Sequence, residues 1–373
     1  MDQTVYQKLL SPLSLEEAEG RIRKAGAALT TWYKAAARDL PWRRTKDPYA
    51  IWVSEVMLQQ TRVETVIPYY RRFLSALPDI KALAEADEMQ LHKLWEGLGY
   101  YSRVRNLQRA ARQIMADYGG VMPQSRDALL SLCGIGSYTA GAVASIAFGE
   151  RTPAVDGNVL RVVSRLLAAE GDILSPSVRK GVEALLLSQM PDDAGSFNQA
   201  VMDLGAGVCL PNGAPECAAC PVCDCCLAAQ RGQQLAFPVK APKAKRRIEE
   251  RTVFLIRTAA GETLLRRRPE EGLLAGLWEF PNEEGRLGRE EAAALLAGRG
   301  IRPQKLQTLG KSKHIFTHLE WQMAGYLAIC GDVPLQPGEV LATDRERRQA
   351  YTIPSAFDAY KQVLDSIAKE KGI

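Results

Sequence analysis

The sequence predicts a two-domain protein, with a mainly α-helical N-terminal region and a smaller C-terminal domain of the α+β class. At 373 residues the chain is too long for one ordinary domain. Apolar residues recur at helical spacing from about residue 14 to residue 230, and strand-like runs begin after residue 250. Residues 238–250 contain two prolines and few apolar side chains. We therefore expect a helical region over residues 1–237, a basic linker over 238–250 and a second domain over 251–373.

The composition is that of an ordinary globular protein, with 46% hydrophobic and 24% charged residues. A net charge of +5 permits a polyanionic partner but does not require one. The apolar run AGAVASIAF is too short to span a membrane, because Gly149, Glu150 and Arg151 end it. The N-terminus lacks the basic start and apolar core of a secretory signal. We expect a cytoplasmic monomer that does not bind membranes.

Five segments of the N-terminal region combine helical periodicity with start and stop signals. Ser14, Asp87 and Ser125 are well suited to cap helix N-termini, and the runs stop at Gly or Pro. His92 lies on one of these helices, where we expect it at the surface. The segments cover residues 13–40, 85–98, 102–120, 125–134 and 157–171.

The C-terminal domain is predicted from three strand-like runs, over residues 252–258, 261–268 and 321–330, and one helical stretch over 288–300. The linker before it carries five positive charges between Lys240 and Arg247. Such a segment can be a solvated tether alone or can also contact phosphate, and its composition does not decide between the two.

The stretch CGIGSYTAG, residues 133–141, lies between two helical segments. Gly134 and Gly136 permit positive φ angles and the close approach of another backbone. Exposed amides of this turn, with the positive end of the following helix, could bind a phosphodiester. Taken alone, the Gly-x-Gly pattern is more typical of a plain corner between two helices.

Two carboxylates lie in contrasting surroundings. Glu55 is a lone acid among apolar residues in IWVSEVMLQQ, so it is either the polar side of an amphipathic helix or a buried acid with a raised pKa. Asp156 directly precedes the helical run GNVLRVVSRLL, so it can be an N-cap or can stabilise a sugar cation as an ionised carboxylate. One protonated acid and one ionised acid form the pair that glycosidic cleavage requires.

Six of the eight cysteines fall within residues 209–226. Cys217, Cys220, Cys223 and Cys226 recur every third residue, a spacing that favours an iron–sulfur cluster over the separated pairs of a zinc ribbon. A bound metal is also more consistent with a reducing cytoplasm than a set of disulfides.

These motifs together resemble the MutY-type adenine DNA glycosylases of the endonuclease III, helix-hairpin-helix superfamily. The resemblance rests on RDLPWR (38–43), SEVMLQQTRV (54–63), EGLGYYSRVRNL (96–107), the turn at 132–140 and TPAVDGNVLRV (152–162), and covers roughly residues 30–230. One departure is Cys133, where the family usually has proline. The resemblance implies a six-helix barrel, a cluster domain, and a base-excision repair enzyme that removes adenine opposite 8-oxoguanine or guanine in nucleoid DNA.

The resemblance also implies residue roles. Glu55 would protonate adenine at N7, and Asp156 would stabilise the sugar cation with the help of Asn158. A bifunctional lyase would need a lysine where this chain has Tyr138, so the resemblance implies base removal without strand cleavage. The remaining residues implied in DNA or substrate binding are Arg38, Gln60, Thr61, Arg62, Leu98, Tyr100, Gly134 and Gly136.

The family carries a [4Fe–4S] cluster, and its pattern maps onto Cys209, Cys217, Cys220 and Cys226. The first gap of the pattern holds seven residues here, one more than in the family. Cys223 and Cys225 are then surplus.

The C-terminal segment around LWEFP resembles a Nudix domain, but the carboxylates that bind metal in Nudix hydrolases are missing after Glu291. In MutY-type enzymes this domain reads 8-oxoguanine through a Phe-Ser-His turn, which Phe316, Thr317 and His318 match with Thr in place of Ser. Two other functions are considered: a bifunctional glycosylase/lyase, and a non-catalytic iron–sulfur protein that binds damaged DNA. Retention of both carboxylates argues against the second.

Overall fold

The computed structural model describes residues 13–242 and 245–370, and its contacts divide the chain into two compact units. The first unit comprises residues 1–85 and 105–242, and the second comprises residues 86–104 and 243–373. Within the described residues, no helix combines the length and the apolar character that crossing a membrane would need.

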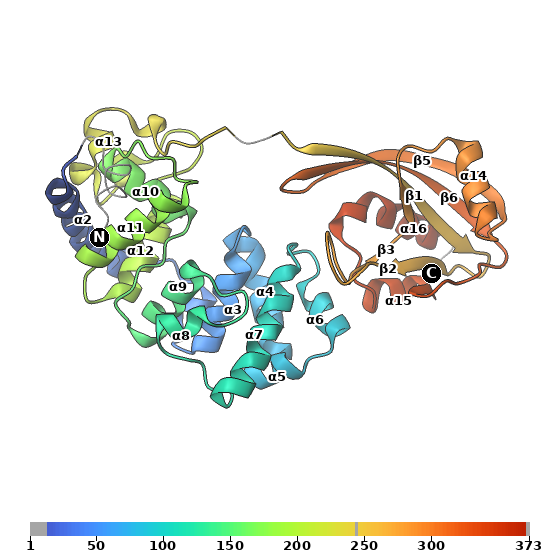
Figure 1. Ribbon diagram of the computed structural model, residues 1–373, viewed down its shortest axis with the longest axis horizontal. Helices are drawn as coiled ribbons and strands as arrows, with labels where there is room; N and C mark the ends of the chain where they lie inside the picture. The colour runs from blue at the N-terminus through green and yellow to red at the C-terminus, as the bar shows by residue number, and fades with distance from the viewer. Residues whose placement is uncertain (1–12, 243–244, 371–373) are drawn as a thin grey trace. The chain divides into compact units, whose positions relative to one another are not determined.

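The first unit consists of helices and short 3-10 turns, as predicted (Figure 1). Its helices in chain order are α2 (Leu15–Ala36), α3 (Pro48–Leu58), α4 (Val63–Ala76), α5 (Ile80–Glu85), α7 (Ser102–Tyr118), α8 (Arg126–Leu130), α9 (Ser137–Phe148), α10 (Gly157–Leu167), α11 (Pro176–Gln189), α12 (Ala194–Gly207) and α13 (Leu227–Gln230). Its 3-10 turns are η1 (Pro41–Arg43), η2 (Cys217–Ala219), η3 (Cys223–Cys225) and η4 (Gln234–Ala236).

The predicted helix starts are confirmed at all three capping residues. The Ser14 hydroxyl accepts from the Glu17 backbone N–H, while the Glu17 carboxylate accepts from Ser14, which completes a capping box. Asp87 caps α6 (Glu88–Trp95), and Ser125 caps α8. The surface position expected for His92 is wrong: its side chain is buried against the ring of Tyr101.

The core of the first unit brings its two ends together. Helix α2 packs against α10, α11 and α12, and buried Ile22, Leu29, Val163 and Phe197 belong to one cluster. Val222, from the cysteine-rich segment, is buried in the same cluster. The cysteine-rich segment therefore rests on helices that also position Asp156.

The second unit contains a seven-stranded mixed sheet, which confirms the α+β prediction. The main strand order is β3-β2-β1-β6-β5, with β4 paired to β1 and β7 paired to β2. β1 and β6 run parallel, whereas every other strand pair is antiparallel. The strands are β1 (Arg247–Thr258), β2 (Thr263–Arg267), β3 (Trp278–Glu279), β4 (Asn282–Glu284), β5 (Pro303–Ile315), β6 (Leu319–Cys330) and β7 (Glu339–Ala342); the helical elements are α6, α14 (Arg289–Gly298), α15 (Asp344–Gln349), η5 (Ser355–Phe357) and α16 (Asp358–Glu370).

Strand β1 is buried on both faces, because alternate side chains enter two separate cores. Val253 and Leu255 join a cluster that includes Leu364 of α16. Phe254 and Ile256 join a second cluster that includes Leu296 of α14. A strand covered on both faces reads as a continuous apolar run, and this run is the signal by which residues 252–258 were predicted.

Sequence patterns missed strand β5 and misplaced the end of the linker. β5 is paired on one side only and alternates polar with half-buried residues, so it lacks the apolar period of a core strand. β1 begins at Arg247, before the predicted end of the linker at residue 250, because its first residues pair with the start of β6.

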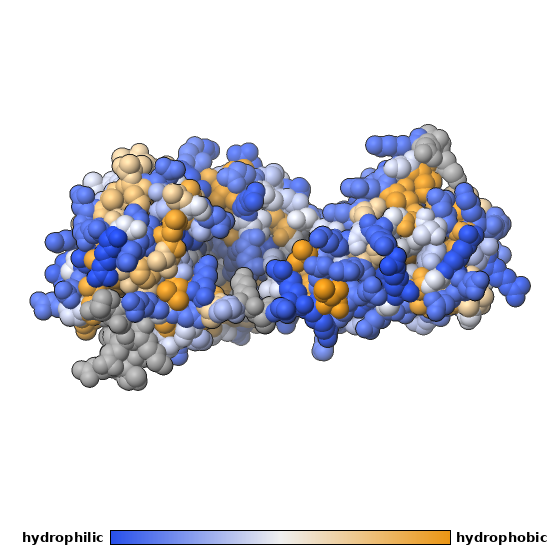
Figure 2. All heavy atoms as spheres, turned by 90° about the horizontal axis from the view of Figure 1, so that it is seen from above, coloured by the Kyte–Doolittle hydropathy of each residue, from blue (hydrophilic) through white to orange (hydrophobic). Residues whose placement is uncertain are grey.

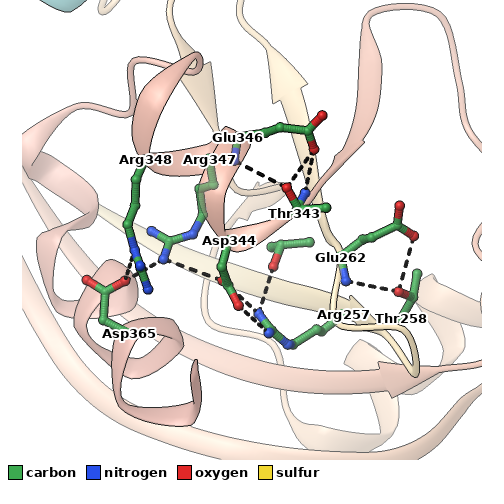
Figure 3. A network of polar contacts seen from close by, with 10 residues as sticks. Arg257, Thr258, Glu262, Thr343, Asp344, Glu346, Arg347, Arg348 and Asp365 are labelled. Carbon is green, nitrogen blue, oxygen red and sulfur yellow. Dashed lines mark hydrogen bonds and ion pairs between the residues drawn. The ribbon is translucent and has the colours of Figure 1, made fainter. Parts of the chain in front are cut away.

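Buried charges link strand β1 to the C-terminal helices (Figure 3). The guanidinium of Arg257, 1% exposed, donates to both carboxylate oxygens of Asp344, at 3.1 and 2.5 Å. Arg347 lies 3.6 Å from the same carboxylate and also contacts Asp365 of α16. Because a buried charge is costly without a partner, these contacts fix α15 and α16 against the sheet.

Figure 2 shows a largely hydrophilic surface with separate hydrophobic patches. The exposed large hydrophobic side chains come from many elements, including Leu15 of α2, Met89 of α6 and Ile315 of β5. Single exposed apolar side chains are normal on soluble domains. They therefore identify no binding surface by themselves.

Candidate active site and cysteine cluster

Glu55 is a buried acid in helix α3. Every residue of this helix from Tyr49 to Met57 is buried, and the Glu55 side chain is only 5% exposed. Burial disfavours the ionised carboxylate and raises the pKa of Glu55 to about 7, although a hydrogen bond from Tyr138 lowers the pKa. The negative charge of Asp156 raises the pKa further, and the guanidinium of Arg43 opposes this. Of the two alternatives left open for Glu55, the structure shows the buried acid.

Tyr138 lies in the first turn of α9, and its hydroxyl donates to Oε2 of Glu55. The same hydroxyl lies 3.5 Å from the sulfur of Met202 in α12. Helices α3 and α9 pack together and bring the two side chains into contact. The sequence identified Tyr138 through the missing lysine, but no pattern predicted this hydrogen bond.

Asp156 caps the N-terminus of α10. Its Oδ1 accepts from the Val159 backbone N–H at 2.8 Å, and its Oδ2 accepts from the Asn158 side-chain amide at 2.8 Å. Burial raises the pKa of Asp156, and these hydrogen bonds lower it in part. The N-cap prediction is therefore confirmed, and capping leaves the carboxylate oriented next to Asn158.

Arg161 holds Asn158 in place. Its Nη2 donates to Oδ1 of Asn158 at 2.8 Å and to the carbonyl of Gly205 at 2.7 Å. Its Nε donates to the carbonyl of Cys209 at 2.9 Å. Asn158 is thus fixed between a carboxylate that accepts from it and a guanidinium that donates to it.

The structure accounts differently for the two glycines of the helix-hairpin-helix turn, Gly134 and Gly136. Gly134 has a φ of 73°, and a Cβ there would lie 2.5 Å from Cβ of Asn106, so the fold itself requires glycine. Gly136 is the N-cap of α9 with a φ of −94°, and a Cβ there would meet nothing within 4 Å. The protein's own packing therefore explains Gly134 but not Gly136.

The other predicted DNA-contacting residues fall at two turns. Gln60, Thr61 and Arg62 join α3 to α4, and Gln60 is exposed with a φ of 58°. Tyr100 is half-exposed with a φ of 47°, whereas Leu98 is buried. A non-glycine residue with positive φ stores strain, which is common at functional turns.

Arg38 pairs with Asp203, a buried residue that the sequence patterns did not identify. The Arg38 guanidinium donates twice to Oδ1 of Asp203, at 2.9 and 2.5 Å, and the Arg43 guanidinium donates to both carboxylate oxygens, at 2.5 and 2.6 Å. The Asp203 side chain is 3% exposed. Burial alone would raise the pKa of Asp203, but the two arginines lower it below its usual value. A lone acid in the apolar run AVMDLGAG was the one available signal.

Phe316, Thr317 and His318 form the turn between β5 and β6. The Phe316 ring packs edge-on against Trp321 at 5.0 Å and anchors the turn, while Thr317 and His318 are exposed. In the second unit the Thr317 hydroxyl lies 3.3 Å from that of Tyr100. Two residues that the resemblance implicates separately, Tyr100 in DNA binding and Thr317 in the recognition turn, are thus neighbours.

The cysteine-rich segment surrounds a pocket lined by five thiols and by apolar side chains of α10 and α12. Turns η2 and η3 place cysteines three residues apart on one side, since a 3-10 helix has three residues per turn. Arg165 donates to Sγ of Cys209 at 3.2 Å. The lining thiols are those of Cys209, Cys217, Cys220, Cys223 and Cys226; Cys225 is not among them.

The donor set around this pocket, five thiols, is chemically suited to an iron–sulfur cluster. In the described part of the chain, no three His, Cys, Asp or Glu side chains could hold a single metal ion. A four-iron cluster is larger than an ion, so its thiolate ligands stand around a cavity. Cys209, Cys217, Cys220 and Cys226 can supply those ligands, with Cys223 as a fifth thiol at the same wall.

The fold and the site define a base-excision repair glycosylase joined to a Nudix domain. The family model of HhH-GPD superfamily base excision DNA repair proteins matches residues 53–186, and that of the NUDIX domain matches residues 252–362. A thermostable thymine-DNA glycosylase superposes with a TM-score of 0.51 and 29% identity, covering 57% of this chain and 99% of its own. A trapped endonuclease III–DNA covalent intermediate gives a TM-score of 0.50 at 24% identity, covering 57% and 98%, and shows the same fold.

Relatives that match over most of this chain identify the kind of glycosylase. The adenine DNA glycosylase of Homo sapiens is 36% identical, over 92% of this chain and 75% of its own length. That of Rattus norvegicus is 40% identical, over 86% and 74%. The chain belongs to the adenine DNA glycosylase family, whose enzymes act in base-excision repair.

Proposed function

We propose that this chain is a monofunctional glycosylase that removes adenine paired with 8-oxoguanine, or with guanine, from duplex DNA. The observation that carries the proposal is the pair of carboxyl groups. Glu55 is buried, with a pKa raised to about 7, and Asp156 is held by Asn158 and the start of α10. A neutral acid and an ionised acid in one site suit the cleavage of an N-glycosidic bond.

In this mechanism Glu55 donates its proton to N7 of adenine. The bond between N9 and the sugar C1′ then breaks, and its electron pair leaves with the base as neutral adenine. The sugar becomes an oxocarbenium ion, which the negative charge of Asp156 stabilises. Water adds at C1′ and loses a proton, which restores the Glu55 acid and leaves an abasic site.

Adenine must leave the stacked duplex before Glu55 can reach it, and extrusion costs a few kcal/mol. The exposed turn at Gln60 and the exposed side chain of Tyr100 are suited to fill the gap that the base leaves. The open face at Gly136, with the amides that begin α9, is suited to bind the phosphodiester beside the extruded nucleotide.

The reaction ends at base removal because the site offers a phenol where a lyase needs an amine. The Tyr138 hydroxyl is hydrogen-bonded to Glu55, and a phenol cannot form a Schiff base with C1′. Trapping with borohydride separates the alternatives: a lyase gives an efficient covalent adduct with DNA, and a monofunctional enzyme does not.

The C-terminal unit reads the base opposite adenine in this proposal and does not hydrolyse nucleotides. Thr317 and His318 are exposed at the tip of a turn that Phe316 anchors. Glu291, one of the two acids in the first turn of α14, accepts from the backbone N–H of Gly288 as a cap. It therefore serves the helix itself.

We also propose that Cys209, Cys217, Cys220 and Cys226 hold a [4Fe–4S] cluster. The cluster would cross-link the segment that follows α12 and so order its loops. It would have no part in base removal, which uses the chain's own acids. Iron content tests the ligand set: Cys217→Ser should lose iron, while Cys223→Ser and the control Cys225→Ser should keep it. Loss of iron in Cys223→Ser with retention in Cys209→Ser would show that the ligand set is wrong.

The deciding experiment is single-turnover cleavage of duplexes that carry adenine opposite 8-oxoguanine, guanine or thymine. Adenine release should be fastest opposite 8-oxoguanine and slowest opposite thymine. Glu55→Gln and Asp156→Asn should each abolish release while still binding the duplex. No release by the native protein would leave a non-catalytic damage-binding protein, and full activity in both variants would refute the mechanism.

A further inference from the structure

Five thiols line a pocket where a four-iron cluster needs only four. One comes from the loop that follows α12 and the others come from the cysteine-rich segment: Cys209, Cys217, Cys220, Cys223 and Cys226. A cluster of this type takes one cysteine thiolate for each iron. One thiol at the pocket is therefore surplus to the ligand set proposed above.

The surplus thiol, that of Cys223, is placed in the same way as its neighbours along the chain. The backbone N–H of Cys223 donates to the carbonyl of Cys220 at 3.2 Å, and the N–H of Cys226 donates to that of Cys223 at 3.0 Å. The N–H of Cys220 is bonded to Cys217 likewise, at 3.2 Å. Each cysteine is thus one 3-10 turn from the next, so the four side chains leave the segment on the side of the pocket.

The spacing provides two complete ligand sets that share three members. With Cys226 as the fourth ligand, the set follows the spacing of the glycosylase family except for one extra residue in the first gap. With Cys223 instead, residues 217–223 read C-x2-C-x2-C, the run that gives three ligands to one cluster in bacterial ferredoxins, where the fourth ligand is remote in sequence. Here the remote ligand is Cys209, whose Sγ accepts from Arg165 at 3.2 Å.

We propose that Cys223 is a reserve ligand, which binds the iron that Cys226 would hold whenever the Cys226 thiolate is lost. The inference rests on the proposed [4Fe–4S] cluster and concerns which thiols hold it. The Cys223 thiol releases its proton to water as its sulfur binds the iron, and no oxidation state changes. Three ligands are common to both sets, so only the fourth is exchangeable: Cys209, Cys217 and Cys220.

The structure also indicates which of the two exchangeable thiols is the resident ligand. Cys226 is the N-cap of α13, its carbonyl accepts from the Gln230 N–H at 3.0 Å, and its side chain packs against the core of the first unit. Cys223 lies between Val222, which is buried in that core, and the exposed Asp224. Cys226 is the more firmly held, and Val222 keeps Cys223 at the pocket when Cys226 is replaced.

Cys225 provides a matched control within the same segment. Its thiol donates to the carbonyl of Val222 at 3.4 Å, and its own carbonyl accepts from the Arg21 guanidinium of α2 at 2.7 Å. Its side chain packs against the core of the first unit and is outside the pocket lining. Cys225 is therefore a nearby thiol that is not placed to replace a ligand.

The test is the iron and sulfide content of Cys226→Ser, with and without Cys223→Ser. Serine is a favoured N-cap, so this substitution keeps the start of α13. Cys226→Ser should keep about four irons and four sulfides per chain, whereas Cys223→Ser/Cys226→Ser should fall to about three irons or fewer because only three ligands remain. The control Cys225→Ser/Cys226→Ser should match Cys226→Ser.

Alkylation by iodoacetamide gives a second readout on the loaded protein. Cys223 should react in the native protein and should be protected in Cys226→Ser, because its sulfur then binds iron. Peptide mass spectrometry measures the difference. Unchanged alkylation of Cys223 would overturn the proposal, as would equal iron loss in Cys226→Ser and Cys223→Ser/Cys226→Ser. Four irons in both variants would also overturn it, because the fourth ligand would then be a serine oxygen or water.

The failure of the reserve ligand can be told apart from the failure of the cluster. A native protein that binds no iron, even after reconstitution with iron and sulfide, would refute the proposed cluster. Iron in the native protein but none in folded Cys226→Ser rejects the reserve ligand alone. Circular dichroism of the helices shows whether each variant is folded, and Cys226→Ala, with and without Cys223→Ser, repeats the comparison if the serine variant does not fold.

Discussion

Replacing Tyr138 with phenylalanine tests how the structure sets the acidity of Glu55. The hydroxyl of Tyr138 donates to Oε2 of Glu55, and this hydrogen bond stabilises the ionised carboxylate and lowers its pKa. Tyr138→Phe removes the donor and leaves the ring, so burial is unchanged and the pKa must rise. The active, protonated form of Glu55 should then persist to higher pH.

The size of the effect follows from the bond that is lost. A hydrogen bond to a charged group contributes about 1.5–3 kcal/mol, and 1.36 kcal/mol corresponds to one pH unit. Starting from a pKa of about 7, the value for Glu55 should rise by about one to two pH units. Single-turnover adenine release, measured from pH 5 to 9, should show its descending limb displaced upward by that amount.

Tyr49→Phe is the matched control. Tyr49 is also a buried tyrosine, on the same helix as Glu55, but its hydroxyl donates to the carbonyl of Leu77 at 2.8 Å. This variant should lose stability without any displacement of the limb. The reasoning fails if Tyr138→Phe leaves the limb unmoved or shifts it to lower pH, since either result would mean that the bond does not favour the ionised acid.

Four further predictions follow from the same site. Asp156→Asn should abolish adenine release yet lower the melting temperature only slightly, because asparagine keeps the cap on the Val159 N–H and loses the hydrogen bond from Asn158; a large loss of stability would contradict this. The pKa of Glu55 is raised from 4.5 to about 7 in the folded protein, so the folded state loses about 3 kcal/mol of stability relative to the unfolded state as the pH rises through this range. In urea unfolding, Glu55→Gln should therefore be more stable than the native protein at pH 8 and similar to it at pH 4. Gly134→Ala should lower the melting temperature, whereas Gly136→Ala should keep it and weaken binding to DNA; equal stability losses would refute the different reasons given for the two glycines. Thr317→Ala should reduce the preference for 8-oxoguanine over guanine by about 2- to 10-fold if one neutral hydrogen bond is lost, measured as the ratio of two cleavage rates.

The helix starts and the central strands were predictable because their signals are local. Ser14, Asp87 and Ser125 each act on the backbone within three residues, so no knowledge of the rest of the fold is needed. The apolar run of β1 signals burial on both faces wherever its partners lie. Strand β5 gives no such signal, because it lies at an edge and its conformation depends on pairing with β6.

The site residues likewise divide into those that a local motif identifies and those whose role depends on packing. The motifs identified Glu55 and Asp156, but whether Glu55 faces inward depends on how α3 packs, which periodicity cannot tell for a helix that is apolar all round. Asp203 was missed because its role exists only once α12 meets η1, more than 150 residues away in sequence. The misjudged His92 has the same cause, since its surroundings come from packing and not from its own helix.

The parallel pairing of β1 with β6 sets the order in which the C-terminal unit can form during synthesis. β1 ends at Thr258, but the partner that pairs with its whole length begins at Leu319. At about 5–20 residues per second, roughly 3 to 12 s separate the emergence of the two strands from a ribosome. Through that interval the edge of the run VFLI that pairs with β6 is open and aggregation-prone, although its other edge can already pair with β4. The basic residues Lys245, Arg246 and Arg247, which precede the run by a few residues, are placed to act as gatekeepers. The positive charge at the end of the linker would then protect the nascent chain before the finished enzyme meets DNA.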